Sequence, residues 1–116
     1  MVEINDEIRQ IVHRFLREVV RSGIHLENAY IFGSYAKGVA NPYSDIDVAV
    51  ISSDLSDDRY HERLRLMEIA GAIDSRIEPA PFNFSTFTQD NPVAWEVLKT
   101  GILMSGVRRK DVNYAK

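Results

Sequence analysis

Apolar residues recur every three or four positions through the first part of the chain, which is the spacing of one face of an α-helix. Charged residues such as Arg9, Arg14 and Arg17 fall largely on the other side, and Gly23 is a natural stop. The pattern predicts an amphipathic helix that ends near Gly23. Its apolar positions are Ile4, Ile8, Ile11, Val12, Phe15, Leu16, Val19 and Val20.

Short apolar runs after this helix predict β-strands. Residues Asn28–Phe32 form the first run, and residues 46–51 form a second that is rich in β-branched side chains, which favour strands. Residues 75–78 predict a third, short strand, which Pro79 and Pro81 are expected to stop because proline cannot donate to a strand ladder.

A polar loop, residues 52–58, separates the second strand from a predicted second helix. Ser56 or Asp57 is the expected N-cap, and the helix is expected to run to about Asp74. Its apolar face comprises Leu66, Met67, Ile69, Ala70 and Ile73.

The last helix is predicted from a cap followed by proline, at Asn91 and Pro92, and ends before Gly101. Residues 102–104 predict a final strand. Strands that alternate with helices indicate an α/β or α+β fold, with a small sheet flanked by helices.

The length of 116 residues suits one ordinary domain. We expect that domain to span residues 1–106, with residues 107–116 as a C-terminal tail. The basic run in the tail is interpreted as a solvated end of the chain rather than a binding site. It consists of Arg108, Arg109 and Lys110.

Charge and cysteine content narrow the function. A net charge of -3 argues against a nucleic-acid binder, which usually presents a basic face. The chain has no cysteine, so disulfides, thiolate metal sites and cysteine nucleophiles are excluded. No apolar run approaches the roughly 18 residues of a membrane span, and no signal peptide is recognised. We therefore expect a cytoplasmic protein that does not enter a membrane.

Two aspartates open the second strand. Residues two apart on a strand point to the same face, so Asp45 and Asp47 are expected to project side by side while Ile46 and Val48 face a core. Adjacent carboxylates repel each other and disfavour ionisation. A hard cation with oxygen ligands compensates, and Mg²⁺ commonly binds carboxylates together with substrate phosphates.

A glycine turn follows the first strand and precedes this acidic pair. Gly33 allows close approach of a ligand, and Ser34 offers a hydroxyl and a backbone N–H. If the next residues form a helical turn, their free N–H groups point at a phosphate, with Lys37 as a nearby positive charge and Gly38 as the stop. The turn and the acidic pair together predict a nucleoside-triphosphate site beside a metal.

This segment resembles the motif of the DNA polymerase beta superfamily of nucleotidyltransferases: Gly-Ser, about ten residues, then Asp-x-Asp. Here ten residues separate Ser34 from Asp45. The best match covers residues 28–51, and a weaker resemblance runs from the first helix to about residue 104. The short chain with an early motif resembles the minimal nucleotidyltransferase subgroup, which implies a small mixed sheet flanked by helices.

The resemblance also implies a third carboxylate from a later strand. Glu78 is the best match and Asp74 the reserve, while an ion pair with a neighbouring arginine is the alternative for Glu78. The implied mechanism uses two Mg²⁺ ions between Asp45, Asp47, Glu78 and the triphosphate, with Glu78 as proton acceptor. Ser34 and Lys37 would hold the triphosphate. Ser44 is assigned to the nucleotide site as an orienter of the Asp45 turn, with a plain turn serine as the alternative.

Three functions are compatible with this motif. In the subgroup it resembles, the enzyme transfers AMP from ATP to a tyrosine of a HEPN-type toxin, for which it is the antitoxin, and we favour this function. The chain has no second domain to bind a small acceptor, so we expect a partner protein to complete the site. A non-catalytic partner-binding subunit, or transfer to a small molecule as in aminoglycoside nucleotidyltransferases, is the alternative. The sequence leaves the oligomeric state open, a homo-oligomer included.

Overall fold

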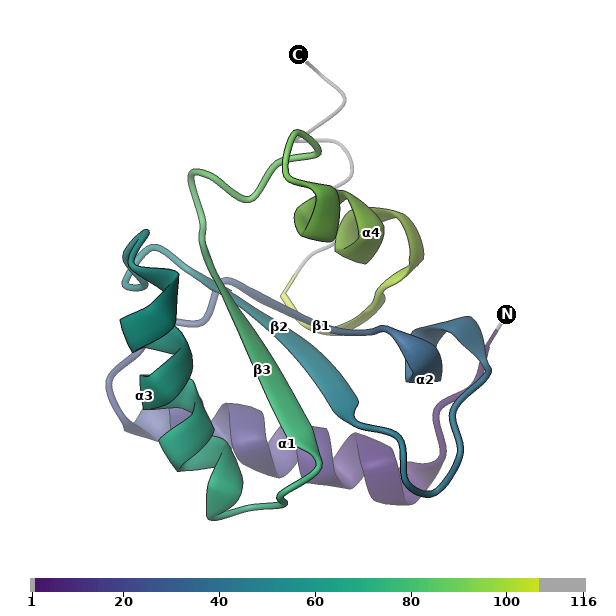
Figure 1. Ribbon diagram of the computed structural model, residues 1–116. Helices are drawn as coiled ribbons and strands as arrows, with labels where there is room; N and C mark the ends of the chain where they lie inside the picture. Colours follow the sequence, from purple (N-terminus) through teal and green to yellow (C-terminus); the bar gives the residue numbers. More distant parts are fainter. Residues whose placement is uncertain (1, 107–116) are drawn as a thin grey trace.

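A mixed four-stranded sheet runs through the middle of the protein, with helices on both faces (Figure 1). The computed structural model describes residues 2–106. The strand order is β3-β2-β1-β4. β1 (Asn28–Phe32) is antiparallel to both β2 (Ile46–Ser52) and β4 (Ile102–Ser105), whereas β2 is parallel to β3 (Ile77–Asn83). The α+β fold with a small mixed sheet is confirmed.

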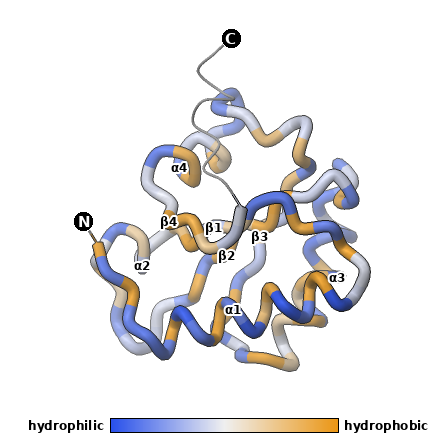
Figure 2. The backbone as a smooth tube through the Cα atoms, turned by 180° about the vertical axis from the view of Figure 1, so that it is seen from behind, coloured by the Kyte–Doolittle hydropathy of each residue, from blue (hydrophilic) through white to orange (hydrophobic). Residues whose placement is uncertain are grey.

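The amphipathic helix α1 (Asp6–Arg21) covers one face of this sheet. Asn5 caps it, because its Oδ1 accepts a hydrogen bond of 2.9 Å from the backbone N–H of Ile8. Apolar and polar positions alternate along α1 at helical spacing (Figure 2). Val20 departs from the predicted apolar face, since it is 53% exposed. The helix buries Ile8, Ile11, Val12, Phe15, Leu16 and Val19.

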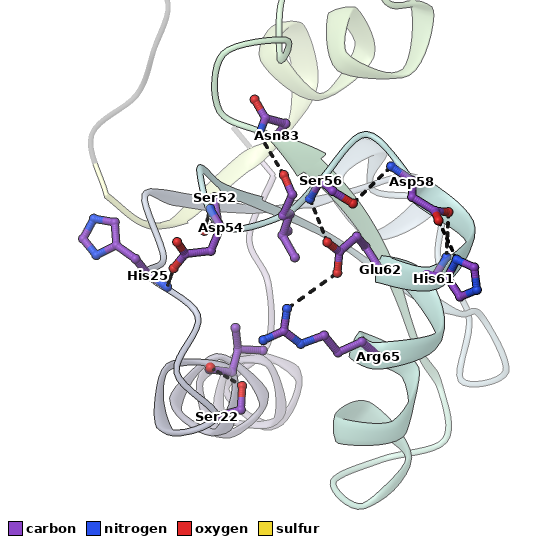
Figure 3. A network of polar contacts seen from close by, with 12 residues as sticks. Ser22, His25, Ser52, Asp54, Ser56, Asp58, His61, Glu62, Arg65 and Asn83 are labelled. Atoms are coloured by element: carbon purple, nitrogen blue, oxygen red, sulfur yellow. Dashed lines mark hydrogen bonds and ion pairs between the residues drawn. The ribbon is translucent and has the colours of Figure 1, made fainter.

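Helix α3 (Arg59–Gly71) packs beside α1, and its start differs from the prediction. The cap is Asp58, whose Oδ1 accepts from the backbone N–H of His61 at 3.2 Å, rather than Ser56 or Asp57. Ser56 supports the cap, because its Oγ accepts from the backbone N–H of Asp58 (Figure 3). Several polar residues near a helix start compete for the cap, and this loop geometry selects the last of them.

The end of α3 and the course of β3 also correct the prediction. The helix ends at Gly71, before Asp74, and β3 continues through both prolines to Asn83. The carbonyl of Arg76 accepts from the backbone N–H of Ile46 at 2.7 Å, so alternate residues of β3 face β2. The prolines occupy the intervening positions, toward the open edge of the sheet, where no ladder hydrogen bond is lost.

Helix α4 (Pro92–Thr100) covers the opposite face (Figure 1). Asn91 caps it as predicted, because its Oδ1 accepts from the backbone N–H of Val93 and of Ala94. A second apolar cluster lies under α4, whereas Ile46, Val48 and Val50 belong to the cluster under α1 and α3. The second cluster contains Tyr30, Ala49, Ile51, Phe82, Phe87, Ala94, Val97 and Leu98.

Two predictions concern the limits of the chain. The expected tail, residues 107–116 with its basic run, lies outside the described residues, so the domain boundary at residue 106 stays a prediction. Among residues 2–106, no helix combines the length and the apolar character that a membrane span requires.

Candidate functional site

The acidic pair lies where β2 begins. Asp45 directly precedes the strand and is exposed, while Asp47 is its second residue and is half-buried. Ile46 between them is fully buried in the cluster under α1 and α3. Alternation along the strand therefore directs Asp47 to the face that carries α4. This is the division between carboxylates and core that the sequence predicts.

The glycine turn lies against Asp47 of the acidic pair. Gly33 directly follows β1 and has φ 71° and ψ −146°, a conformation essentially restricted to glycine. A Cβ atom placed at Gly33 would lie 2.1 Å from Oδ2 of Asp47. The short helix α2 (Ser34–Lys37) starts immediately afterwards and ends at Gly38, which is left-handed. The Asp47 carboxylate therefore occupies the space that any side chain at Gly33 would need.

Glu78 lies next to Asp47 on the neighbouring strand, since their Cα atoms are register partners between β2 and β3. One of its carboxylate oxygens, Oε2, is 2.5 Å from a guanidinium nitrogen of Arg63 on α3. Glu78 therefore makes the ion pair that was the alternative to a metal-binding role, and it also lies next to Asp47. Asp74, the reserve residue, instead binds the guanidinium of Arg76 through both oxygens, which holds the pKa of that carboxyl below its usual range.

Lys37 and Ser44 take part in local contacts beside the acidic pair. The Lys37 ammonium is 3.2 Å from Oε2 of Glu96 on α4. Ser44 closes the loop that leads to Asp45, because its Oγ accepts from the backbone N–H of Asn41 at 2.9 Å and its own N–H donates to the Asn41 carbonyl. Ser44 thus acts as a turn residue here, and its role toward a nucleotide stays a prediction.

Glu96 is a site residue that sequence reasoning missed. It is far from the motif in sequence and follows no ligand spacing. Helix α4 brings it to the acidic pair, where its charge acts on the Asp47 carboxylate. Its only sequence signal is an acidic residue in the helix between the buried positions Ala94 and Val97.

The electrostatics of Asp47 indicate a place for a cation. Burial, and then the charges of Asp45, Glu78 and Glu96, raise the pKa of Asp47 from 3.8 to about 6, against a smaller opposing effect of Lys37. A half-buried carboxylate surrounded by other negative charges has too little positive charge near it to favour its ionised form. A bound cation would supply the missing charge.

The donor set fits magnesium in part. Within residues 2–106, no three carboxylate or imidazole groups are gathered closely enough to hold a metal ion by themselves. Asp45 and Asp47 nevertheless offer the one or two carboxylates that Mg²⁺ takes when water and phosphate oxygens complete its shell. Glu78 lies beside Asp47 on the neighbouring strand, with its Oε2 held by Arg63.

The raised pKa predicts an unusual pH dependence of stability. The folded protein holds the Asp47 proton more tightly than the unfolded chain does, so the contribution of Asp47 to the free energy of unfolding decreases as pH rises from 3.8 to about 6. Relative to Asp47→Asn, we expect the unfolding temperature of the metal-free protein to fall over this interval and then level. Thermal unfolding of both proteins between pH 4 and pH 7 tests this, and parallel profiles would contradict it. Mg²⁺ should recover stability above pH 6, where the carboxylate is ionised.

A mixed sheet with an acidic pair against a Gly-Ser turn is the arrangement of a nucleotidyltransferase domain. The family model described as "Polymerase beta, Nucleotidyltransferase" matches residues 14–109, and the chain belongs to this family. The resemblance drawn from the motif is thereby confirmed. Among curated proteins, the sequence comparison finds no significant match.

Similar solved structures include several toxin–antitoxin complexes. One, described as a toxin–antitoxin with AMP-PNP, is 26% identical with a TM-score of 0.63, covering 90% of this chain and 77% of that one. Another contains a tri-AMPylated HEPN toxin of Shewanella oneidensis with an MNT antitoxin, at 24% identity and TM-score 0.58, covering 90% and 77%. A putative nucleotidyltransferase from Sulfolobus solfataricus is 22% identical with a TM-score of 0.60, covering 84% and 78%. The two neighbours below 25% identity agree with this chain in fold.

Proposed function

We propose that the protein is a magnesium-dependent nucleotidyltransferase that transfers AMP from ATP to a hydroxyl of a partner protein. The observation that carries this proposal is the contact between the Gly33 turn and the Asp47 carboxylate. This contact places an expected phosphate-binding turn beside a carboxylate whose negative charge is not balanced by nearby positive groups. We place the activity in the cytoplasm.

Each side chain has a role in this reaction. Asp45 and Asp47 would hold Mg²⁺, and Ser34 and Lys37 would bind the triphosphate, for which Lys37 would exchange its contact with Glu96. Magnesium, when bound, would neutralise charge on the triphosphate and make the acceptor hydroxyl more acidic, and the family mechanism uses two ions. The acceptor oxygen bonds to the α-phosphorus, the bond to the β-phosphate bridging oxygen breaks, and pyrophosphate leaves. Glu78 accepts the hydroxyl proton after its carboxylate has separated from Arg63.

The proposed partner is a HEPN-type toxin, for which this protein would be the antitoxin. The support is the set of structural neighbours described as toxin–antitoxin complexes, one of them with a tri-AMPylated HEPN toxin.

A mass measurement tests this proposal. The protein is incubated with Mg²⁺, ATP and the product of the adjacent gene, and that product is then weighed by mass spectrometry. We expect a gain of one adenylyl group or a small multiple of it. Tight association without a mass change would instead favour a non-catalytic partner-binding subunit. Transfer only to an added small hydroxylated acceptor would favour nucleotidyl transfer to a small molecule.

A further inference from the structure

A cavity of about 690 Å³ opens between Lys37 of α2 and helix α4. Three other cavities, of about 260, 290 and 330 Å³, lie elsewhere among the described residues. The larger volume falls within the roughly 300–1,000 Å³ of small-molecule sites. Lys37 and Glu96 line it, and both act on the charge of Asp47, so the cavity continues from the phosphate end of the site.

The cavity wall contains an aromatic ring that the cores do not use. Trp95 is 47% exposed, and it lies on the outer side of α4 while Ala94, Val97 and Leu98 are buried under the helix. Lys99, one turn later, places its ammonium 4.6 Å from the centroid of the indole. This contact restrains the ring across the helix surface and leaves nearly half of the residue accessible.

Apart from Pro92, the remaining lining is polar, and it combines the ammonium groups of Lys37 and Lys99 with several acceptors. Glu96 and Asp90 contribute carboxylates, and Gln89 contributes an amide. Such acceptors suit the exocyclic amino groups of adenine, cytosine and guanine, which donate hydrogen bonds. An aromatic face combined with a few acceptors is the usual composition of a site that binds a base by stacking and then selects it by hydrogen bonding.

We infer that this cavity is the subsite for the nucleobase of the nucleoside triphosphate, with the base stacked on Trp95 and its amino group facing Glu96 or Asp90. The inference rests on the proposed function, because it assumes that the triphosphate binds at Ser34 and Lys37. It adds that Trp95 contributes to nucleotide affinity without contacting the reacting phosphate.

Fluorescence provides a direct test, since Trp95 is the only tryptophan of the chain. Binding is measured by calorimetry and by tryptophan emission, with Mg²⁺ and either ATP or inorganic tripolyphosphate, which has no base. We expect ATP to quench the emission strongly and tripolyphosphate to bind with a much smaller change. ATP that binds without altering the emission would overturn the inference.

Variants separate stacking from other roles of Trp95. Trp95→Ala should weaken ATP binding roughly 5- to 100-fold, as expected for loss of one stacked base, and leave tripolyphosphate binding within about twofold. Trp95→Phe should restore most of the affinity. Tyr60→Ala is the matched control, because Tyr60 is 70% exposed on α3 and does not line the cavity, and it should have no effect. Thermal unfolding verifies the fold of each variant.

The possible failures are distinguishable. If Trp95→Ala binds ATP as tightly as the parent but loses the partner protein, the cavity is a partner contact and the inference is wrong. If ATP binds with the expected quenching but no adenylyl group is transferred, the base subsite stands and the proposed function fails. If ATP does not bind at all, both fail.

Discussion

Asp47→Asn is expected to reduce nucleotidyl transfer by at least about 1,000-fold while the protein stays folded. The loss of a metal-binding carboxylate removes several kcal/mol of transition-state stabilisation, and each 1.4 kcal/mol corresponds to a factor of ten in rate. The isosteric amide keeps the packing beside Gly33. Because ionised Asp47 is disfavoured in the fold, the variant should unfold at neutral pH at the same temperature as the parent or higher.

Transfer is measured as the adenylyl gain of the partner, and unfolding by circular dichroism. Asp57→Asn is the control, since Asp57 is an exposed aspartate of the loop before α3, at the other end of β2. It should keep parental transfer. Retained activity in Asp47→Asn would rule out the metal site proposed for this protein, whereas loss of both activity and fold would show that Asp47 is structural.

Gly33→Ala is expected to lower the free energy of unfolding by about 2 kcal/mol or more and to impair transfer severely. Its backbone lies in a region essentially restricted to glycine, which costs about 1–3 kcal/mol for other residues. The new methyl would also overlap Oδ2 of Asp47 at 2.1 Å, so the carboxylate must move away from the turn. Denaturant unfolding and the transfer assay measure the two effects.

Gly71→Ala is the matched control for this substitution. Gly71 is the last residue of α3, and a Cβ atom there would meet nothing within 4 Å. Its stability should be unchanged or raised by up to about 1 kcal/mol, because alanine favours the helix. In an Asp47→Ala background, Gly33→Ala should cost less than in the parent, since only the backbone strain remains. An equal cost in both backgrounds would mean that the carboxylate contact contributes nothing.

Local patterns predicted much of the fold. The cap Asn91 acts on N–H groups two and three residues away, so the sequence alone identifies it. The helical spacing of α1 and the alternation around Asp47 reflect periods of the backbone itself. These features depend on neighbours in the chain, and the structure contains them where they were predicted.

Local patterns failed where several residues offered the same signal or where the sheet decided. The shape of the loop makes Asp58 the cap of α3 instead of Ser56 or Asp57. In the sequence, Pro79 and Pro81 indicate the end of a strand, because proline has no N–H group to donate. β3 is an edge strand, so no neighbouring strand on its open side needs those N–H groups and the strand continues through both prolines. A sequence does not state which strand lies at an edge.

By itself, the sequence determined the chemistry of the site: a glycine turn, a serine and two aspartates at a spacing that a β-strand turns to one face. Only the tertiary structure decided what surrounds them. The pairing of β2 with β3 sets Glu78 beside Asp47, and the packing of α4 brings Glu96 to Lys37. The physical reason is range, because caps and periodicity act within a few residues, whereas these contacts depend on the order and register of the whole sheet.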